Sequence, residues 1–303
     1  MSTNITMTFE EFCDVVKRHF EEKYPEAEVV VKDVTKNNGL VLTGLCVRKG
    51  EAVLPIIYLQ NYWKLFRTSN DLPEIFKGID QTLSKKFEFP ADFTANDIKE
   101  FSKTKDHLCL RVINKEKNKE FLKTVPYITI LDLAVIPYIY FGDGASTIVT
   151  DNILEMWKID KEEFIKNYIP MALTNTNKIL PGQIFNMVHF IGSITGIEIK
   201  EDDPAEDIMY IMTNQAKYYG ASCLATEGNK LKEFANKHQS GFYIIPSSVH
   251  ELIFVLGDHN RKDSKSLYRM VREVNNTCVD KDEVLSDNVY YFDRELGYPI
   301  MAE

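Results

Sequence analysis

Residues 241–260 read GFYIIPSSVHELIFVLGDHN, and this stretch decides the fold expected for the C-terminal part of the chain. Two apolar runs, Phe242 to Ile245 and Leu252 to Val255, flank a polar insert. A strand with one face in water alternates apolar and polar side chains, and neither run does so. We therefore expect two central strands of a sheet, covered on both faces by helices at 228–238 and 263–275.

The polar insert between the two runs carries a candidate catalytic site. On an extended chain Ser248 and His250 would share one face and Glu251 the other. A serine, a histidine and a carboxylate are the groups with which a hydrolase activates its nucleophile. The G-x-S-x-G pattern of a nucleophile elbow is absent, however, and serines after Pro246 also bond to backbone groups in a turn. Both the catalytic and the structural interpretation stay open.

A metal site is a second hypothesis for the same stretch. His250, Glu251, Asp258 and His259 are all residue types that bind zinc. Their spacing is not the H-E-x-x-H of a zinc protease, and an aspartate after a glycine commonly organises a turn. Asp258 and His259 remain the metal candidates, although we expect no bound metal and no cofactor.

Two further segments resemble functional motifs but lack residues or surroundings that those motifs require. The segment 142–147, GDGAST, lacks the Gly-Lys-Ser/Thr of a phosphate-binding loop. Cys223 follows Gly-Ala-Ser in what we interpret as a buried strand, where a thiol is inert. We therefore expect neither a nucleotide site at 142–147 nor a catalytic thiol at Cys223.

Composition narrows the class of protein. With 44% hydrophobic and 27% charged residues, the 303-residue chain resembles an ordinary globular protein. A net charge of −9 argues against a general nucleic-acid binder, which needs a cationic surface. The five cysteines are scattered without C-x-x-C spacing, no signal peptide is visible, and the most apolar run, 127–141, is too short to span a membrane. We expect a cytoplasmic protein that binds neither membranes nor nucleic acid in general.

The order of the predicted elements indicates an α+β fold with mainly antiparallel sheets and packed helices. Residues 1–95 read as a capped helix, a three-stranded meander and further helices, residues 96–200 as a middle α+β unit, and residues 201–303 as a C-terminal α+β unit. Within the last unit we expect a hairpin that joins 207–213 to 219–225. A strand followed by Gly-Asp, a polar loop and a helix occurs at both 133–144 and 252–259, and this repeated order gives the hypothesis that the two later units are similar halves.

Several segments carry a resemblance to a known family. The two most specific are PSSVHE at 246–251 and EVLSDNVYYFD at 283–293, and shorter ones are MTFEEF at 7–12, NNG at 37–39, IYL at 57–59 and YGA at 219–221. On these segments the chain resembles an uncharacterised bacterial family, a domain of unknown function common in anaerobic gut Firmicutes. The opening and the DLAV at 132–135 are similar, more distantly, to a second uncharacterised family of the same bacteria. The resemblance implies no activity, cofactor or catalytic residue.

The functional expectation therefore rests on the residues alone. We expect a non-catalytic protein-binding or regulatory module with a protein partner, because no catalytic motif has its proper spacing and 15 Tyr and 18 Phe offer many interface anchors. The alternative is a hydrolase or metal-assisted enzyme that uses Ser248, His250, Asp258 and His259.

Overall fold

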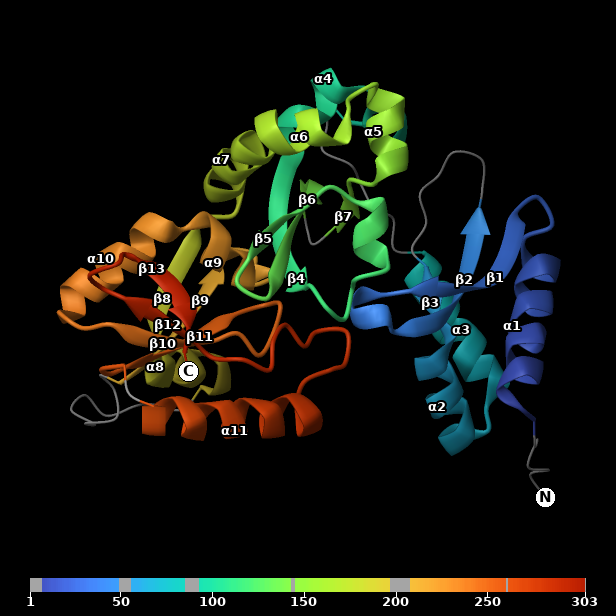
Figure 1. The fold of residues 1–303 in the computed structure, drawn as a ribbon. Helices are drawn as coiled ribbons and strands as arrows, with labels where there is room; N and C mark the ends of the chain where they lie inside the picture. Colours follow the sequence, from blue (N-terminus) through green and yellow to red (C-terminus); the bar gives the residue numbers. More distant parts are fainter. Residues whose placement is uncertain are drawn as a thin grey trace. The chain divides into compact units, whose positions relative to one another are not determined.

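The computed structural model describes six stretches of the chain, in which the side chains of residues 95, 194, 261 and 262 are left aside: residues 7–48, 56–84, 93–142, 145–196, 208–259 and 261–302. The chain divides into two compact units, residues 1–96 and residues 97–303, and each is described by itself (Figure 1). Helices and mainly antiparallel sheets occur in both, which confirms the predicted α+β class. The three-part division expected from the sequence stays a prediction.

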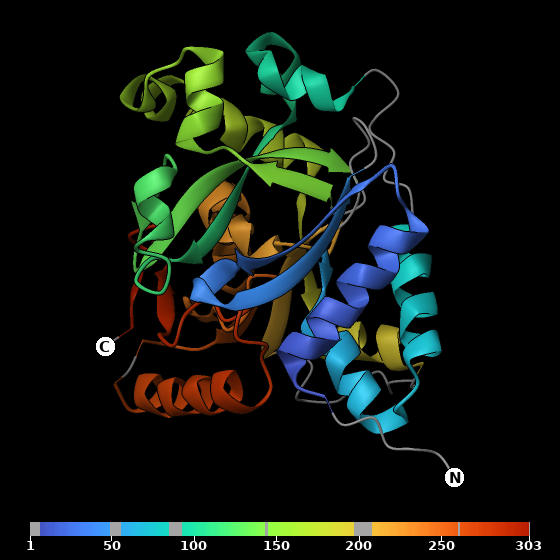
Figure 2. The same cartoon turned by 90° about the vertical axis from the view of Figure 1, so that its right-hand side faces the viewer.

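The first unit packs helices against a small antiparallel sheet of strand order β1-β2-β3 (Figure 2). Its elements are α1 (Phe9–Lys23), β1 (Glu28–Thr35), the short turn η1 (Asn37–Gly39), β2 (Val41–Arg48), β3 (Ile57–Tyr58), α2 (Leu59–Ser69) and α3 (Leu72–Leu83). The Thr8 hydroxyl accepts from the amide of Glu11 and the Glu11 carboxylate accepts from the amide of Thr8, so the predicted capping box starts α1. The third strand was expected from residue 53, but residues 53–55 lie outside the described residues.

Aromatic side chains fill the core of this unit. Phe12 and Phe20 of α1 are fully buried, and the Phe12 ring lies 5.3 Å from that of Trp63 and 5.6 Å from that of Phe66 on α2. The two helices therefore share one apolar seam over the sheet.

The second unit begins with a four-stranded sheet in which β6 pairs with β4, β5 and β7. Its elements are η2 (Ala95–Lys99), α4 (Phe101–Thr104), η3 (Lys105–His107), β4 (Leu108–Asn114), η4 (Phe121–Thr124), β5 (Ile128–Ile130), β6 (Leu133–Gly142), β7 (Ala145–Ile148), α5 (Asp151–Trp157), α6 (Lys161–Asn167) and α7 (Ile169–Ile179). Pro170 stands in the first turn of α7, where the break between α6 and α7 tolerates it.

Pro137 does not interrupt β6, although a proline in a central strand removes a ladder hydrogen bond. The Pro137 carbonyl accepts from the amide of Val149, so its nitrogen faces the same side. On that side β5 pairs only as far as Val135 and β7 pairs only from Tyr138. Pro137 therefore lies in the gap between two partner strands, where no amide donor is needed.

A six-stranded antiparallel sheet of order β13-β12-β10-β11-β9-β8 completes this unit. Its elements are β8 (Gly182–Asn186), α8 (Met187–Thr195), β9 (Met209–Asn214), η5 (Gly220–Ser222), α9 (Cys223–Thr226), α10 (Gly228–His238), β10 (Phe242–Ile245), β11 (Leu252–Leu256), α11 (Arg261–Thr277), β12 (Tyr290–Asp293) and β13 (Tyr298–Met301). The predicted pair, β10 and β11, takes the two central places.

Both faces of the central pair are covered, as the sequence predicts. On one face the Phe234 ring of α10 lies 5.0 Å from Phe242 and 5.4 Å from Phe254. On the other face Val271 of α11 packs in one cluster with Tyr243. Figure 1 shows α10 and α11 beside this sheet.

The hairpin expected between 207–213 and 219–225 is wrong. β9 exists, but it pairs with β8 and β11, and residues 220–226 form η5 and α9 instead. Gly220 packs so closely that a Cβ there would lie 2.1 Å from the Thr213 hydroxyl and 2.4 Å from the His250 carbonyl oxygen. The small residues at 220–222 thus allow two stretches of backbone to approach each other closely. From the sequence alone, this run of small and apolar residues resembles a strand.

Strand β13 ends the sheet on one side. Ala302 donates to the carbonyl of Val289, and in the alternating antiparallel pattern the backbone of Pro299 then faces away from β12. The Pro299 nitrogen, which carries no hydrogen, therefore lies on the unpaired edge of the sheet.

Two remaining expectations concern the internal repeat and membrane-spanning helices. The similarity of two halves rests partly on Asp143 and Gly144, which lie outside the described residues. Of the helices that the structure describes, none is long and apolar enough to cross a membrane.

Candidate functional site

The polar insert 246–251 joins the central strands β10 and β11 and is held by the segment 283–286. Val249 donates to the Glu283 carbonyl (2.9 Å), Leu285 donates to the Ser247 carbonyl (3.0 Å), and Ser286 donates to the Pro246 carbonyl (2.9 Å). The two segments that carry the most specific family resemblance therefore pair with each other. This backbone pairing makes the insert a fixed loop of the sheet.

The Ser248 side chain is buried and forms its hydrogen bonds within that loop. It is 6% exposed, and its hydroxyl oxygen accepts from the amide of His250 at 3.0 Å. It also hydrogen-bonds to the carboxyl of Glu251, whose pKa burial raises above its usual value while the bond to Ser248 lowers it. Since the insert is not a strand, the alternation that separates Ser248 from Glu251 does not hold.

His250 has a partner at each ring nitrogen. The amide of Tyr219 donates to Nδ1 (3.3 Å), and Nε2 lies 3.3 Å from a carboxylate oxygen of Glu283. Nδ1 as acceptor places the proton of a neutral ring on Nε2, which faces Glu283. The ring also lies 5.3 Å from the Tyr218 ring and 5.7 Å from the Tyr219 ring.

Asp258 and His259 do not join this group. They follow the far end of β11, a strand of five residues that spans roughly 16 Å at ~3.3 Å per residue. There the His259 ring stacks on Tyr291 at 4.5 Å, and the Asp258 carbonyl accepts from the Tyr243 hydroxyl at 3.2 Å. Within the six described stretches, no three His, Cys, Asp or Glu side chains are placed to hold a metal ion.

The two remaining motifs give no reactive group among the described residues. Asp143 and Gly144 of the 142–147 segment lie outside them. Cys223 begins helix α9 instead of lying in a strand, and burial raises the pKa of its thiol to about 12. A thiol with that pKa stays protonated at neutral pH.

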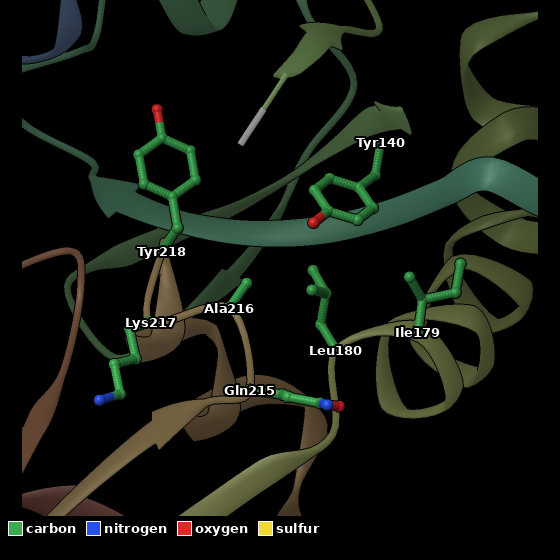
Figure 3. Close-up of a pocket in the computed structure, with 7 residues that line it drawn as sticks. All are labelled: Tyr140, Ile179, Leu180, Gln215, Ala216, Lys217 and Tyr218. Carbon is green, nitrogen blue, oxygen red and sulfur yellow. The ribbon is translucent and has the colours of Figure 1, made fainter. Parts of the chain in front are cut away.

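A pocket of about 770 Å³ is lined by Tyr218, whose ring lies next to that of His250. Figure 3 shows Tyr140 of β6 on one side and Tyr218 on the other, with Ile179 at the end of α7 and Leu180 after it as an apolar wall. The loop 215–218 closes it, and the Lys217 ammonium points away, 5.2 Å from the Phe190 ring. The volume lies in the range of small-molecule pockets.

Arg111 of β4 lies in the tyrosine cluster next to this pocket. Its guanidinium carbon is 4.4 Å from the centre of the Tyr219 ring and 5.6 Å from that of Tyr138. The residue is 9% exposed, and its Nε is buried without a hydrogen-bond partner. Burial raises the pKa of Tyr138 and Tyr218 above the ordinary value, and the Arg111 charge opposes the rise in both.

The sequence holds one signal for Arg111 that the motif search passed over. Strand β4 reads LCLRVIN, and every residue in it is buried. A lone cation in a fully buried strand is costly, so it marks a position where an anion or a π system stabilises the charge. The tyrosines gave no signal, because the chain brings them together from separate segments.

Comparisons with known proteins give a family without an activity. A family model described as a family of unknown function (DUF5688) matches residues 9–294. No curated protein matches the chain, and no solved structure does.

Proposed function

Because the chain belongs to DUF5688, a family of unknown function, its role is inferred from its own surface, and we propose that it is a non-catalytic protein-binding or regulatory module. The observation that carries the proposal is the outward face of α11. Met270 is 43% exposed and Val274, one turn further on, is 37% exposed. The inward face of the same helix packs Val271 into the core of the sheet, so the outward apolar pair serves no purpose in that core.

Exposed cations lie on another flank of the same helix, at least about 100° around the helix axis from Met270 and Val274, while the exposed Glu273 lies nearer the pair. Lys265, Arg269 and Arg272 are exposed on α11, and none of them forms an ion pair with another residue in the described stretches. In a chain with net charge −9, this basic face stands out. Met and Arg are enriched at protein interfaces. The matching partner is a protein with an apolar patch beside an acidic one.

The occupied side chains of Ser248 and His250 support binding over catalysis. A serine nucleophile needs a nearby base to take its proton. Here Ser248 hydrogen-bonds to the amide of His250 and to the carboxyl of Glu251, not to the His250 ring, and both nitrogens of that ring have other partners.

A pull-down from lysate of the native host tests the proposal. The double variant Arg269→Glu/Met270→Glu should lose the proteins that the wild type retains, and added salt should weaken their retention. The matched control is Lys64→Glu/Leu65→Glu, an exposed cation and an exposed apolar neighbour on α2, which should retain them. The proposal fails if the wild type retains no reproducible partner, or if both double variants behave alike.

The alternative is a hydrolase or metal-assisted enzyme, favoured by the pairing of His250 with Glu283 beside the pocket. An esterase and phosphatase screen, together with elemental analysis of the purified protein, distinguishes it. Turnover or stoichiometric zinc that disappears in a folded His250→Ala variant would establish the enzyme and remove the binding proposal.

We also propose a cytoplasmic location. All five cysteines are free thiols, which is typical of a reducing compartment. Fractionation of host cells with an antibody against the chain tests it, and recovery outside the cytoplasmic fraction would refute it.

A further inference from the structure

Arg111 is a buried charge without a counter-charge in the described part of the chain. It takes part in no hydrogen bond and no ion pair there, and Glu283, the acid whose charge acts on the neighbouring Tyr218, is paired with His250. An isolated buried cation lowers the free energy of unfolding, so buried charges normally have partners. The two tyrosine rings offset only part of the free energy of hydration that the buried guanidinium loses, because a cation–π contact is weaker than the interaction of the cation with water.

Two tyrosine rings contact the guanidinium, whose carbon lies 4.4 Å from the centre of Tyr219 and 5.6 Å from that of Tyr138. These contacts use no N–H group as a hydrogen-bond donor, and the buried Nε has no acceptor among the described residues. A planar fork of donors is the geometry that pairs with two oxygens of a carboxylate or phosphate. The arrangement is therefore that of an anion receptor.

The pocket adjoins this receptor through two tyrosines. Tyr218 lines the pocket, and the Arg111 charge acts on its hydroxyl. Tyr140 lines the opposite side, and its ring meets that of Tyr138 edge-on with 6.3 Å between the centres. The pocket thus supplies an apolar wall, phenol hydroxyls and a neighbouring unpaired cation.

We propose that this pocket binds a small organic anion, a carboxylate or a phosphate monoester. Its charged group pairs with Arg111, and its apolar body lies against Ile179 and Leu180. The proposal is independent of the α11 surface, which lies on a different part of the unit.

Calorimetric titration of the full chain with three probes of similar size tests the ligand class. Phenyl phosphate and benzoate carry the charge, and benzamide is the neutral counterpart of benzoate. We expect both anions to bind and benzamide to bind at least tenfold more weakly, a difference of about 1.4 kcal/mol. Absence of binding by both anions, or equal binding of benzoate and benzamide, would overturn the proposal. A preference between the anions identifies the carboxylate or the phosphate as the natural group.

Two variants assign the charge to Arg111. Arg111→Met keeps an unbranched, apolar stem and removes the guanidinium, and we expect it to weaken binding of benzoate and phenyl phosphate at least tenfold. We also expect its thermal midpoint to equal or exceed that of the wild type, because removal of an unpaired buried charge is neutral or stabilising. The control Lys178→Met removes an exposed cation on α7, next to the pocket wall, and should change the affinity less than twofold.

Arg111→Lys keeps a charge but not the flat fork, and it gives a second test if the methionine variant does not fold. We expect a folded protein with anion affinity reduced several-fold. Unchanged affinity in either Arg111 variant, or an equal loss in Lys178→Met, would show that the anions respond to general charge and would refute the site.

Discussion

Gly220 shows at the scale of one residue how the loops around the pocket are fixed. Its backbone touches Thr213 and the His250 carbonyl at distances that leave no room for a side chain. Gly220→Ala should therefore shift the loop and lower the free energy of unfolding by about 1–3 kcal/mol. Denaturant unfolding measures this change. Gly228→Ala is the control, since nothing lies within 4 Å of a Cβ there, and an equal loss in both variants would contradict the argument.

The thiols should differ strongly in reactivity. Burial raises the pKa of Cys13 to about 11 and that of Cys109 and Cys223 to about 12, whereas Cys278 is exposed. Iodoacetamide at pH 8 should thus label Cys278 first in the native protein, as peptide mass spectrometry would show. Fast labelling of Cys109 or Cys223 in folded protein would be inconsistent with their burial.

His250 and Phe254 test whether the insert is a site or part of the core. Phe254 is fully buried against Phe242, so Phe254→Ala should cost about 3–5 kcal/mol. His250→Ala removes two polar contacts of a half-buried ring and should cost about 1–2 kcal/mol. Thermal unfolding of both variants compares the two costs. Should His250→Ala prove equally destabilising, His250 is a core residue and the site interpretation is to be abandoned.

At the same scale, sequence reasoning found the loop but not the receptor. The cluster at Ser248 and His250 was visible because the two residues are close in the sequence. Its hydrogen-bond partners come from distant segments, namely the backbone of Tyr219 and of residues 283–286 and the side chain of Glu283. Arg111, Tyr138 and Tyr218 lie on separate elements. Only pairing of β4 with β6 and the turn before η5 brings them together, and no local pattern encodes that.

At the scale of elements, prediction succeeded where periodicity is strong. The runs at β10 and β11 lack charge, and α10 and α11 are amphipathic, so their types and packing follow from the sequence. Strands β8 and β13 were missed because they lie at the sheet edges, half exposed and without alternation. The predicted hairpin is wrong because β9 pairs with β8, a strand far earlier in the chain, and short sequence patterns do not record such a long-range pairing.

One polar link between helices gives a pH-dependent prediction. Asp80 of α3 lies 2.8 Å from the Lys23 ammonium at the end of α1 and accepts from the Tyr24 hydroxyl. Lys23, then Tyr24, lowers the pKa of Asp80 below its usual value. Such a carboxylate stabilises the fold above its unfolded-state pKa, and the contribution is lost as pH falls through the lower folded-state value.

Asp80→Asn should therefore lower the thermal midpoint at pH 7, and the difference from the wild type should vanish at the most acidic pH where both fold. Glu74→Gln, an exposed change on the same helix, serves as control. A difference that persists or grows on acidification would contradict the assignment.

At the scale of the whole molecule, each unit has a core of its own. One cluster holds Phe12, Phe20 and Ile79, and the second unit has separate clusters around Val125 and Tyr243. We expect a calorimetric scan to resolve two transitions. Phe12→Ala should shift one of them and Phe254→Ala the other, and a single transition moved equally by both variants would show one cooperative unit.

The fold class could be predicted because it follows from the composition and from the order of helices and strands along the chain. The sequence also predicts a second boundary near residue 200, which stays a prediction. Strand β8 precedes the expected boundary near residue 200 and still joins the sheet that follows. Such a pairing depends on contacts between distant segments in the folded sheet and not on a local sequence pattern.

The proline on the outer side of β13 has a consequence for self-assembly. Of the four residues of that strand, Pro299 and Met301 direct their backbone outward, and Pro299 has no hydrogen to donate. A second copy that tried to lengthen the sheet would find a single donor on this side. Concentrated solutions should thus resist fibrillation from this strand. Pro299→Thr restores the donor and should raise thioflavin fluorescence on prolonged incubation, whereas the same change at the exposed Pro73 of α3 should not.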